Sequence, residues 1–70
     1  MNKTQGRYKV EVMDSSGEWI GNQLRFDNPY DAAVYGQDLA FRWTAVRKFR
    51  VFDTEANEPV KDYAEIEVRS

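Results

Sequence analysis

The strongest local signal in the sequence is the start of one helix, which has strand-like segments on both sides. Asn28 is a good N-cap, Pro29 suits the first helical position, and Asp31 places an acid in the first turn. The helix is predicted to begin at Pro29 and to run to residue 43 or 44. A chain of 70 residues has room for only one small domain, so this helix must cover whatever sheet its neighbours form.

The segment before the helix is predicted to form a β-hairpin. Apolar and polar side chains alternate along residues 7–13, which is typical of a half-buried strand. Residues 14–17 have the composition of a turn, and residues 18–26 return as the second strand. The apolar residues of this second strand cannot all lie on one face of a regular strand, so a bulge is expected at residues 21–22.

The segment after the helix is predicted to supply two more strands. Residues 46–53 are rich in β-branched and aromatic side chains, residues 55–59 form a loop, and residues 63–69 alternate again. The order ββαββ predicts an α+β fold, with a four-stranded antiparallel sheet in the order 2-1-3-4 and the helix packed on one face. We expect a single domain, with residues 1–6 as a flexible N-terminus.

The predicted helix has one face of small residues, centred on Gly36. Ala32, Ala33 and Ala40 lie close to Gly36 on a helix that turns about 100° per residue. A glycine in mid-helix costs ~1 kcal/mol relative to alanine, so we expect Gly36 to approach the sheet closely. An aromatic side chain of the sheet region would fill the space opposite it; the candidates are Tyr8, Phe26 and Phe49.

The same helix has a second apolar face, formed by Tyr30, Val34 and Phe41. A two-layer domain covers only one face of its helix, so these three residues are predicted to face outward as the partner-binding site. Two alternatives stay open at this point. The three side chains can be part of an ordinary protein surface, much of which is apolar, or the C-terminal segment can fold over them.

Catalysis and metal binding are not expected. The chain has no His and no Cys, which removes the usual general base near neutral pH and the usual nucleophile–base pairs. Residues 53–57 have some likeness to a calcium loop, but Glu58 stands where the loop needs Gly and Ala64 where it needs a bidentate Glu. We therefore predict a protein that is not an enzyme, with no catalytic residue, no metal and no cofactor.

Four of the ten basic residues lie close together in the sequence, at Arg42, Arg47, Lys48 and Arg50. Aromatic residues lie between them, and basic plus aromatic side chains on a sheet can bind single-stranded nucleic acid. Strand alternation, however, directs Lys48 and Arg50 to one face and Arg47 to the other. The alternative is a solvated strand face on which these charges pair with acids of neighbouring strands.

A cytoplasmic location is expected from what the sequence lacks. A secreted domain of this size usually needs disulfides, and the chain has no Cys. The first residues do not form the apolar stretch of a signal peptide, and no apolar run approaches the ~20 residues that span a bilayer. No membrane partner is expected.

One set of residues carries a resemblance to known proteins: Trp19, Leu24, Arg25, Phe26, Ala32, Ala33, Tyr35, Gly36, Leu39, Arg42, Trp43, Val46, Arg47, Arg50 and Val51. In this pattern the chain resembles short proteins encoded in phage genomes and other mobile elements. The resemblance implies a genomic setting, and with it the host cytoplasm, and it implies no chemistry.

The sequence therefore predicts a small protein-binding module, and in the phage setting that the resemblance implies, a factor that inhibits or redirects a host protein. The expected partner is a host or phage protein, or a second copy of the chain in a homodimer. Two alternatives are a nucleic-acid-binding accessory protein that uses the basic residues and a self-associating structural protein.

Overall fold

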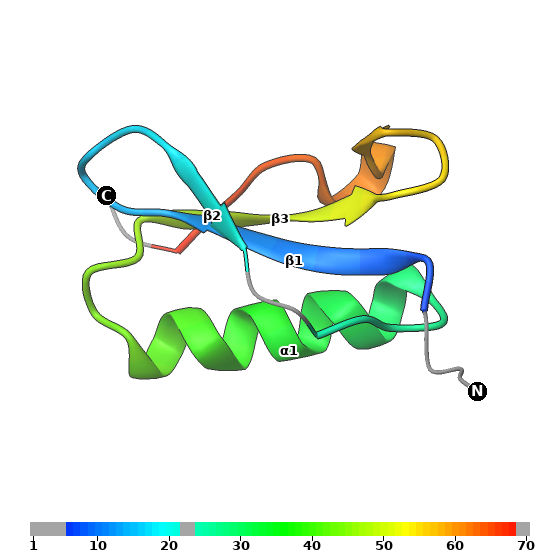
Figure 1. Cartoon of the computed structure of the whole chain (residues 1–70). Helices are drawn as coiled ribbons and strands as arrows, with labels where there is room; N and C mark the ends of the chain where they lie inside the picture. The colour runs from blue at the N-terminus through cyan, green and yellow to red at the C-terminus, as the bar shows by residue number, and fades with distance from the viewer. Residues whose placement is uncertain (1–5, 22–23, 69–70) are drawn as a thin grey trace.

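The computed structural model describes residues 6–21 and 24–68, which form one antiparallel sheet with a helix against one face (Figure 1). The elements, in chain order, are β1 (Tyr8–Met13), β2 (Trp19–Gly21), α1 (Pro29–Arg42), β3 (Lys48–Asp53), β4 (Glu58–Pro59), the 3₁₀ turn η1 (Lys61–Tyr63) and β5 (Ile66–Glu67). The strand order is β2-β1-β3-β4, and β5 also pairs with β3. The predicted α+β fold, its antiparallel 2-1-3-4 order and its single covering helix are confirmed.

The fourth position of the sheet differs from the prediction of one strand at residues 63–69. β4, predicted to be loop, pairs with the end of β3, and β5 pairs with its beginning. Residues 60–65, between β4 and β5, lie opposite only two residues of β3, Arg50 and Val51. This stretch is too long to pair with β3 throughout, and part of it forms η1. The backbone N–H of Val60 still donates to the carbonyl of Val51 at 2.9 Å. The long fourth strand was therefore a wrong prediction, replaced by two short strands and a turn.

The predicted second strand at residues 18–26 is also shorter than expected. Of the described residues in this segment, only Trp19–Gly21 pair regularly with β1. Further along, Phe26 makes an isolated bridge with Tyr8, with backbone hydrogen bonds of 2.8 and 3.0 Å. Part of the bulge predicted at residues 21–22 lies outside the described residues. The same is true of residues 1–5 of the predicted N-terminal segment, whose last residue, Gly6, is buried.

The helix begins as its capping sequence predicts. The side-chain oxygen of Asn28 accepts a hydrogen bond from the backbone N–H of Asp31 at 2.8 Å, and Pro29 is the first helical residue. The helix ends at Arg42, slightly earlier than predicted, where the N–H of Trp43 donates to the carbonyl of Leu39. Among the described residues, no helix is both long and apolar enough to cross a membrane.

The core lies between α1 and the two central strands, and Gly36 sets their separation. A Cβ on Gly36 would lie 2.6 Å from Cδ1 of Phe49 and 3.2 Å from Cγ1 of Val10, closer than packed carbon atoms approach. Phe49, which is 1% exposed, is thus the aromatic residue that fills the space beside the glycine. The predicted close approach of Gly36 is confirmed. Phe26, another of the residues predicted as candidates for this space, packs on the ring of Tyr35 instead.

Candidate functional site

The second apolar face of α1 is exposed, as its phase predicts. Tyr30 is 66% exposed, Val34 is 51% exposed and Phe41 is 80% exposed; together we call them the outer helix stripe. Gly36, on the opposite side of the helix, packs against Phe49 of β3, so the stripe lies on the side of α1 away from the two central strands. The described C-terminal residues run along the edge of β3 instead. Residues up to 68 of that segment do not cover the stripe; of its three residues they approach Phe41 alone, and all three stay at least half exposed.

A groove adjoins the outer helix stripe where α1 faces β5. It has a volume of about 310 Å³ and is lined by Gln37, Phe41, Phe49, Ile66, Glu67 and Val68. Phe41 belongs both to the stripe and to the groove. Most of the lining is apolar, and the volume is sufficient to receive a large side chain. Phe41 therefore joins the stripe to the groove, while the polar Gln37 lies between Val34 and Phe41 on the same side of the helix. Sequence periodicity alone could not reveal the groove, because the groove depends on the position of β5.

Charged side chains lie beside the stripe on its polar flank. Arg42 donates to Asp38 from Nε at 3.0 Å and lies 2.9 Å from it through Nη2, one turn apart on the helix. Both side chains are more than half exposed, so this pair contributes only a few tenths of a kcal/mol, ~0.3–0.5. Asp31 stands near the start of the same flank. The flank therefore carries an acid at its beginning and an acid–base pair at its end.

The basic residues considered for nucleic-acid binding do not form one surface. Arg42 belongs to the helix, whereas Lys48 and Arg50 point to the sheet face away from α1. Lys48 lies 2.6 Å from a carboxylate oxygen of Glu65. Arg47 is exposed, and its side chain makes no ion pair within the described residues. Three of these four charges are thus paired with acids, as the solvated alternative predicts.

Arg50 belongs to a network that the sequence analysis missed. It pairs with Glu11 at 2.7 Å, and Lys9 pairs with the same carboxylate at 3.3 Å. The Arg50 guanidinium also lies 4.3 Å from the ring centre of Trp19 and 5.2 Å from that of Phe52. We call these five residues the outer sheet cluster. Glu11 and Arg50 are direct cross-strand partners, so the 2-1-3-4 order combined with strand alternation could have identified the pair.

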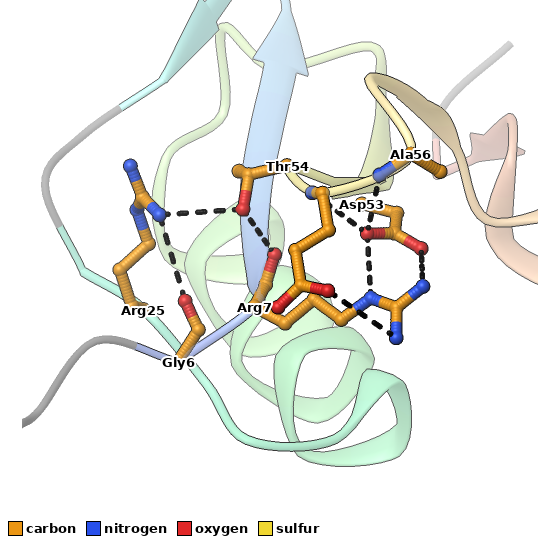
Figure 2. A network of polar contacts seen from close by, with 7 residues as sticks. Gly6, Arg7, Arg25, Asp53, Thr54 and Ala56 are labelled. Atoms are coloured by element: carbon orange, nitrogen blue, oxygen red, sulfur yellow. Dashed lines mark hydrogen bonds and ion pairs between the residues drawn. The ribbon is translucent and has the colours of Figure 1, made fainter.

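A second polar network joins the chain before β1 to the loop after β3 (Figure 2). Arg7 donates to both carboxylate oxygens of Asp53 at 2.8 Å. The same carboxylate accepts the backbone N–H groups of Glu55 and Ala56 at 3.0 and 3.2 Å. The carboxylate that suggested a calcium loop therefore organises a turn, and Asp53 as a whole residue is only 8% exposed.

The Arg7–Asp53 ion pair shifts the pKa of each residue in the direction that favours its charged form. Hydrogen bonding from Arg7, supported by the two backbone donors, lowers the pKa of Asp53 from 3.8 to about 2. The hydrogen bond to Asp53 likewise raises the pKa of Arg7. Figure 2 also shows Thr54, whose hydroxyl donates to the carbonyl of Arg7 at 2.6 Å. Oδ1 of Asp53 accepts three hydrogen bonds and Oδ2 accepts one, all from within the fold, so the network is a structural anchor.

Neither a metal centre nor a known relative adds to this description. Within residues 6–21 and 24–68, no three acidic side chains lie close enough together to hold a metal ion. No protein-family model, curated protein or solved structure gives a significant match to the chain. The site must therefore be judged on its own geometry.

Proposed function

We propose that this chain is a small, non-catalytic protein-binding module whose binding surface is the outer helix stripe and the adjoining groove. The observation that carries the proposal is the exposure of Tyr30, Val34 and Phe41 in one row on the helix. Exposed apolar residues that are scattered singly are ordinary. A row of them that continues into a groove is typical of an interaction site.

The energetics of such a surface favour a protein as the partner. Complete burial of a large apolar side chain contributes ~1.5–3 kcal/mol, and these three side chains are each between half and four-fifths exposed. Transfer of their exposed area out of water supplies enough free energy for a modest complex. An apolar helix face is well suited to another helix or to an apolar groove of a partner.

Nucleic-acid binding has weaker support. The phosphate contacts that dominate such binding need basic groups that are available to phosphates. Here Arg42, Lys48 and Arg50 each lie within 3 Å of a carboxylate oxygen. Salt-dependent binding of labelled single strands that disappears in an Arg47→Ala, Lys48→Ala, Arg50→Ala variant would nevertheless favour that alternative over ours.

The test of the proposed function compares two matched substitutions. Val34→Glu places a charge in the stripe, and Ile20→Glu places the same charge on a similarly exposed aliphatic residue of β2, at 51% and 44% exposure. Each variant and the wild type are immobilised and exposed to a lysate of the native host. Captured proteins are then purified and titrated individually.

We expect at least one protein to bind the wild type and Ile20→Glu with equal affinity and Val34→Glu at least tenfold more weakly. Equal binding of every captured protein to all three chains would contradict the proposal, because the stripe would then have no role in recognition.

A further inference from the structure

We propose that the outer helix stripe and the adjoining groove bind an amphipathic helix of a partner protein, and that Gln37 selects a helix with one hydrogen-bonding side chain in its apolar row. This inference rests on the proposed function and specifies the chemistry of the partner. Three features carry it: the course of the stripe along α1, the amide of Gln37 within that row, and an acid without a basic partner beside Val34.

The stripe runs along three turns of α1, which suits a helical partner segment. From Tyr30 to Phe41 a rise of about 1.5 Å per residue gives a length of about 16 Å. Between the first and last turns, the backbone groups of α1 are hydrogen-bonded within the helix, so the middle of the stripe offers side chains only. An extended segment laid on this surface would lose water from its backbone groups without replacing those hydrogen bonds. A helix brings a backbone that is already satisfied and presents apolar side chains at every third or fourth residue.

Gln37 places a side-chain amide within the row that the stripe forms. It lies three residues after Val34 and four before Phe41, and residues at these spacings are neighbours on a helix surface. It also lines the groove, together with Phe41. The residue is exposed, and its amide makes no hydrogen bond to another of the described residues. The amide is therefore available to a partner.

A partner that covers Val34 and Phe41 also removes the Gln37 amide from water. This amide has two N–H donors and a carbonyl oxygen that accepts, and burial of such a group without a hydrogen-bond partner lowers affinity by about tenfold or more. An amide or hydroxyl side chain of the partner helix restores hydrogen bonds, because both groups donate and accept. A wholly apolar helix face cannot restore them. Gln37 therefore selects between two partners that are otherwise equally apolar.

The groove fixes where the partner helix lies along the stripe. It lies at the Phe41 end and has a volume of about 310 Å³, which is room for one large apolar side chain. Because Gln37 lines the same groove, a side chain seated there lies next to the amide. We therefore expect the hydrogen-bonding residue of the partner within one helical turn of the residue that fills the groove.

The polar flank of the stripe adds a preference for a basic partner. Val34 has an acid about one turn away in each direction, at Asp31 and at Asp38. Asp38 pairs with Arg42 at 2.9 Å. Asp31 accepts a hydrogen bond from the side-chain amide of Asn28 at 3.1 Å, and within the described residues it has no ion pair. The flank thus carries one uncompensated negative charge, and a Lys or Arg beside the apolar row of the partner helix is complementary to it.

Selection from a library of displayed helical peptides tests the occupant and the role of Gln37 together. The peptides have an Ala-rich framework, randomised positions at alternating spacings of three and four, and Lys or Glu beside them. Peptides are selected on the wild type and discarded if they bind Val34→Glu equally well. The selection is repeated on Gln37→Met, a side chain of similar length and helix propensity without the amide. Circular dichroism establishes that each variant is folded, and Gln37→Leu replaces Gln37→Met if that variant is not.

We expect the wild type to select peptides with an amide or hydroxyl side chain at one inner position and with more Lys than Glu beside the row. On Gln37→Met the same inner position should become apolar. Replacing the polar residue of a selected peptide by Leu should weaken binding to the wild type by about tenfold or more and binding to Gln37→Met by less than about threefold. Ile20→Glu should bind the selected peptides as the wild type does.

Three results would overturn the inference. Wholly apolar rows selected on the wild type, or equal losses on the wild type and Gln37→Met, would show that Gln37 does not select. Equally strong stripe-dependent binders from a library with a central proline would show that the occupant is extended. A library without any peptide sensitive to Val34→Glu would remove the helical partner. In each case the capture experiment still decides the proposed function: a stripe-dependent host protein leaves it standing, and the absence of one removes both.

Discussion

The outer face of the sheet and the outer face of the helix differ in how far their aromatic side chains are covered. On the sheet, Arg50 lies over the rings of Trp19 and Phe52. Glu11 in turn pairs with the charge of Arg50. On the helix, Tyr30 and Phe41 expose two-thirds or more of their surface.

The difference shows how a two-layer domain can cover the aromatic residues of one outer face with charged side chains and leave those of the other outer face exposed for binding. The aliphatic stem of a long charged side chain covers apolar surface, and its cationic head group can lie over an aromatic ring. The outer sheet cluster uses both effects. Equivalent charges stand beside the helix stripe, but Arg42 and Asp38 pair with each other there. We infer that the sheet face stabilises the fold, whereas the helix face serves binding.

The largest expected effect tests which helix face is inward. Gly36→Leu should lower the free energy of unfolding by up to about 3 kcal/mol, because the new side chain must displace the ring of Phe49. The denaturant midpoint measures the loss. An unchanged or higher midpoint would mean that Gly36 faces solvent, and the two faces of the helix would then exchange roles.

The next effect concerns the outer sheet cluster. Arg50→Ala should lower the free energy of unfolding by about 1–2 kcal/mol, since it uncovers Trp19 and leaves Glu11 with Lys9 alone. Arg47→Ala is the matched control at an exposed arginine just before β3 and should change stability by less than ~0.5 kcal/mol. Equal losses in the two variants would show that the cluster contributes no more than an ordinary surface charge.

The third effect depends on pH and separates the anchor in Figure 2 from both outward surfaces. The folded pKa of Asp53 is about 2, against an ordinary value of 3.8. A lowered pKa stabilises the fold above the unfolded value, and that stability is lost as the pH falls from about 4 towards about 2. Unfolding curves of the wild type and Asp53→Asn should therefore converge across this range. A constant difference between them would contradict the assignment.

The smallest expected effect on stability is that of Val34→Glu. The residue is half exposed on the helix surface, and glutamate is at least as good a helix former as valine. The free energy of unfolding should change by no more than ~0.5 kcal/mol, as measured in denaturant at a protein concentration where the chain is monomeric. Unfolding of this variant would place Val34 in the core and remove the proposed binding face.

Local chemistry accounts for what could be predicted from the sequence. The start of α1 follows from three nearby residues, Asn28, Pro29 and Asp31. The exposure of Val34 follows from helical periodicity once Gly36 is placed inward. The sheet order follows from a single helical crossover between two hairpin-like halves.

What could not be predicted depends on partners that are distant in the sequence. Arg7 and Asp53 are 46 residues apart and Glu11 and Arg50 are 39 apart, so these pairs emerge only from the register of β1 with β3. The division of the last strand into β4, η1 and β5 reflects a surplus of chain along one edge. The groove depends on β5 in turn and was not predictable for the same reason.

The central claim is that the helix face binds and the sheet face does not, and titration of ¹⁵N-labelled protein with a partner from the capture experiment tests it most directly. Amide chemical shifts are followed while the captured protein is added in steps. The account predicts shifts that change with added partner at Tyr30, Val34 and Phe41 and shifts that stay constant at Glu11 and Arg50. Shifts that change at Glu11 and Arg50 while the helix stays constant would contradict it.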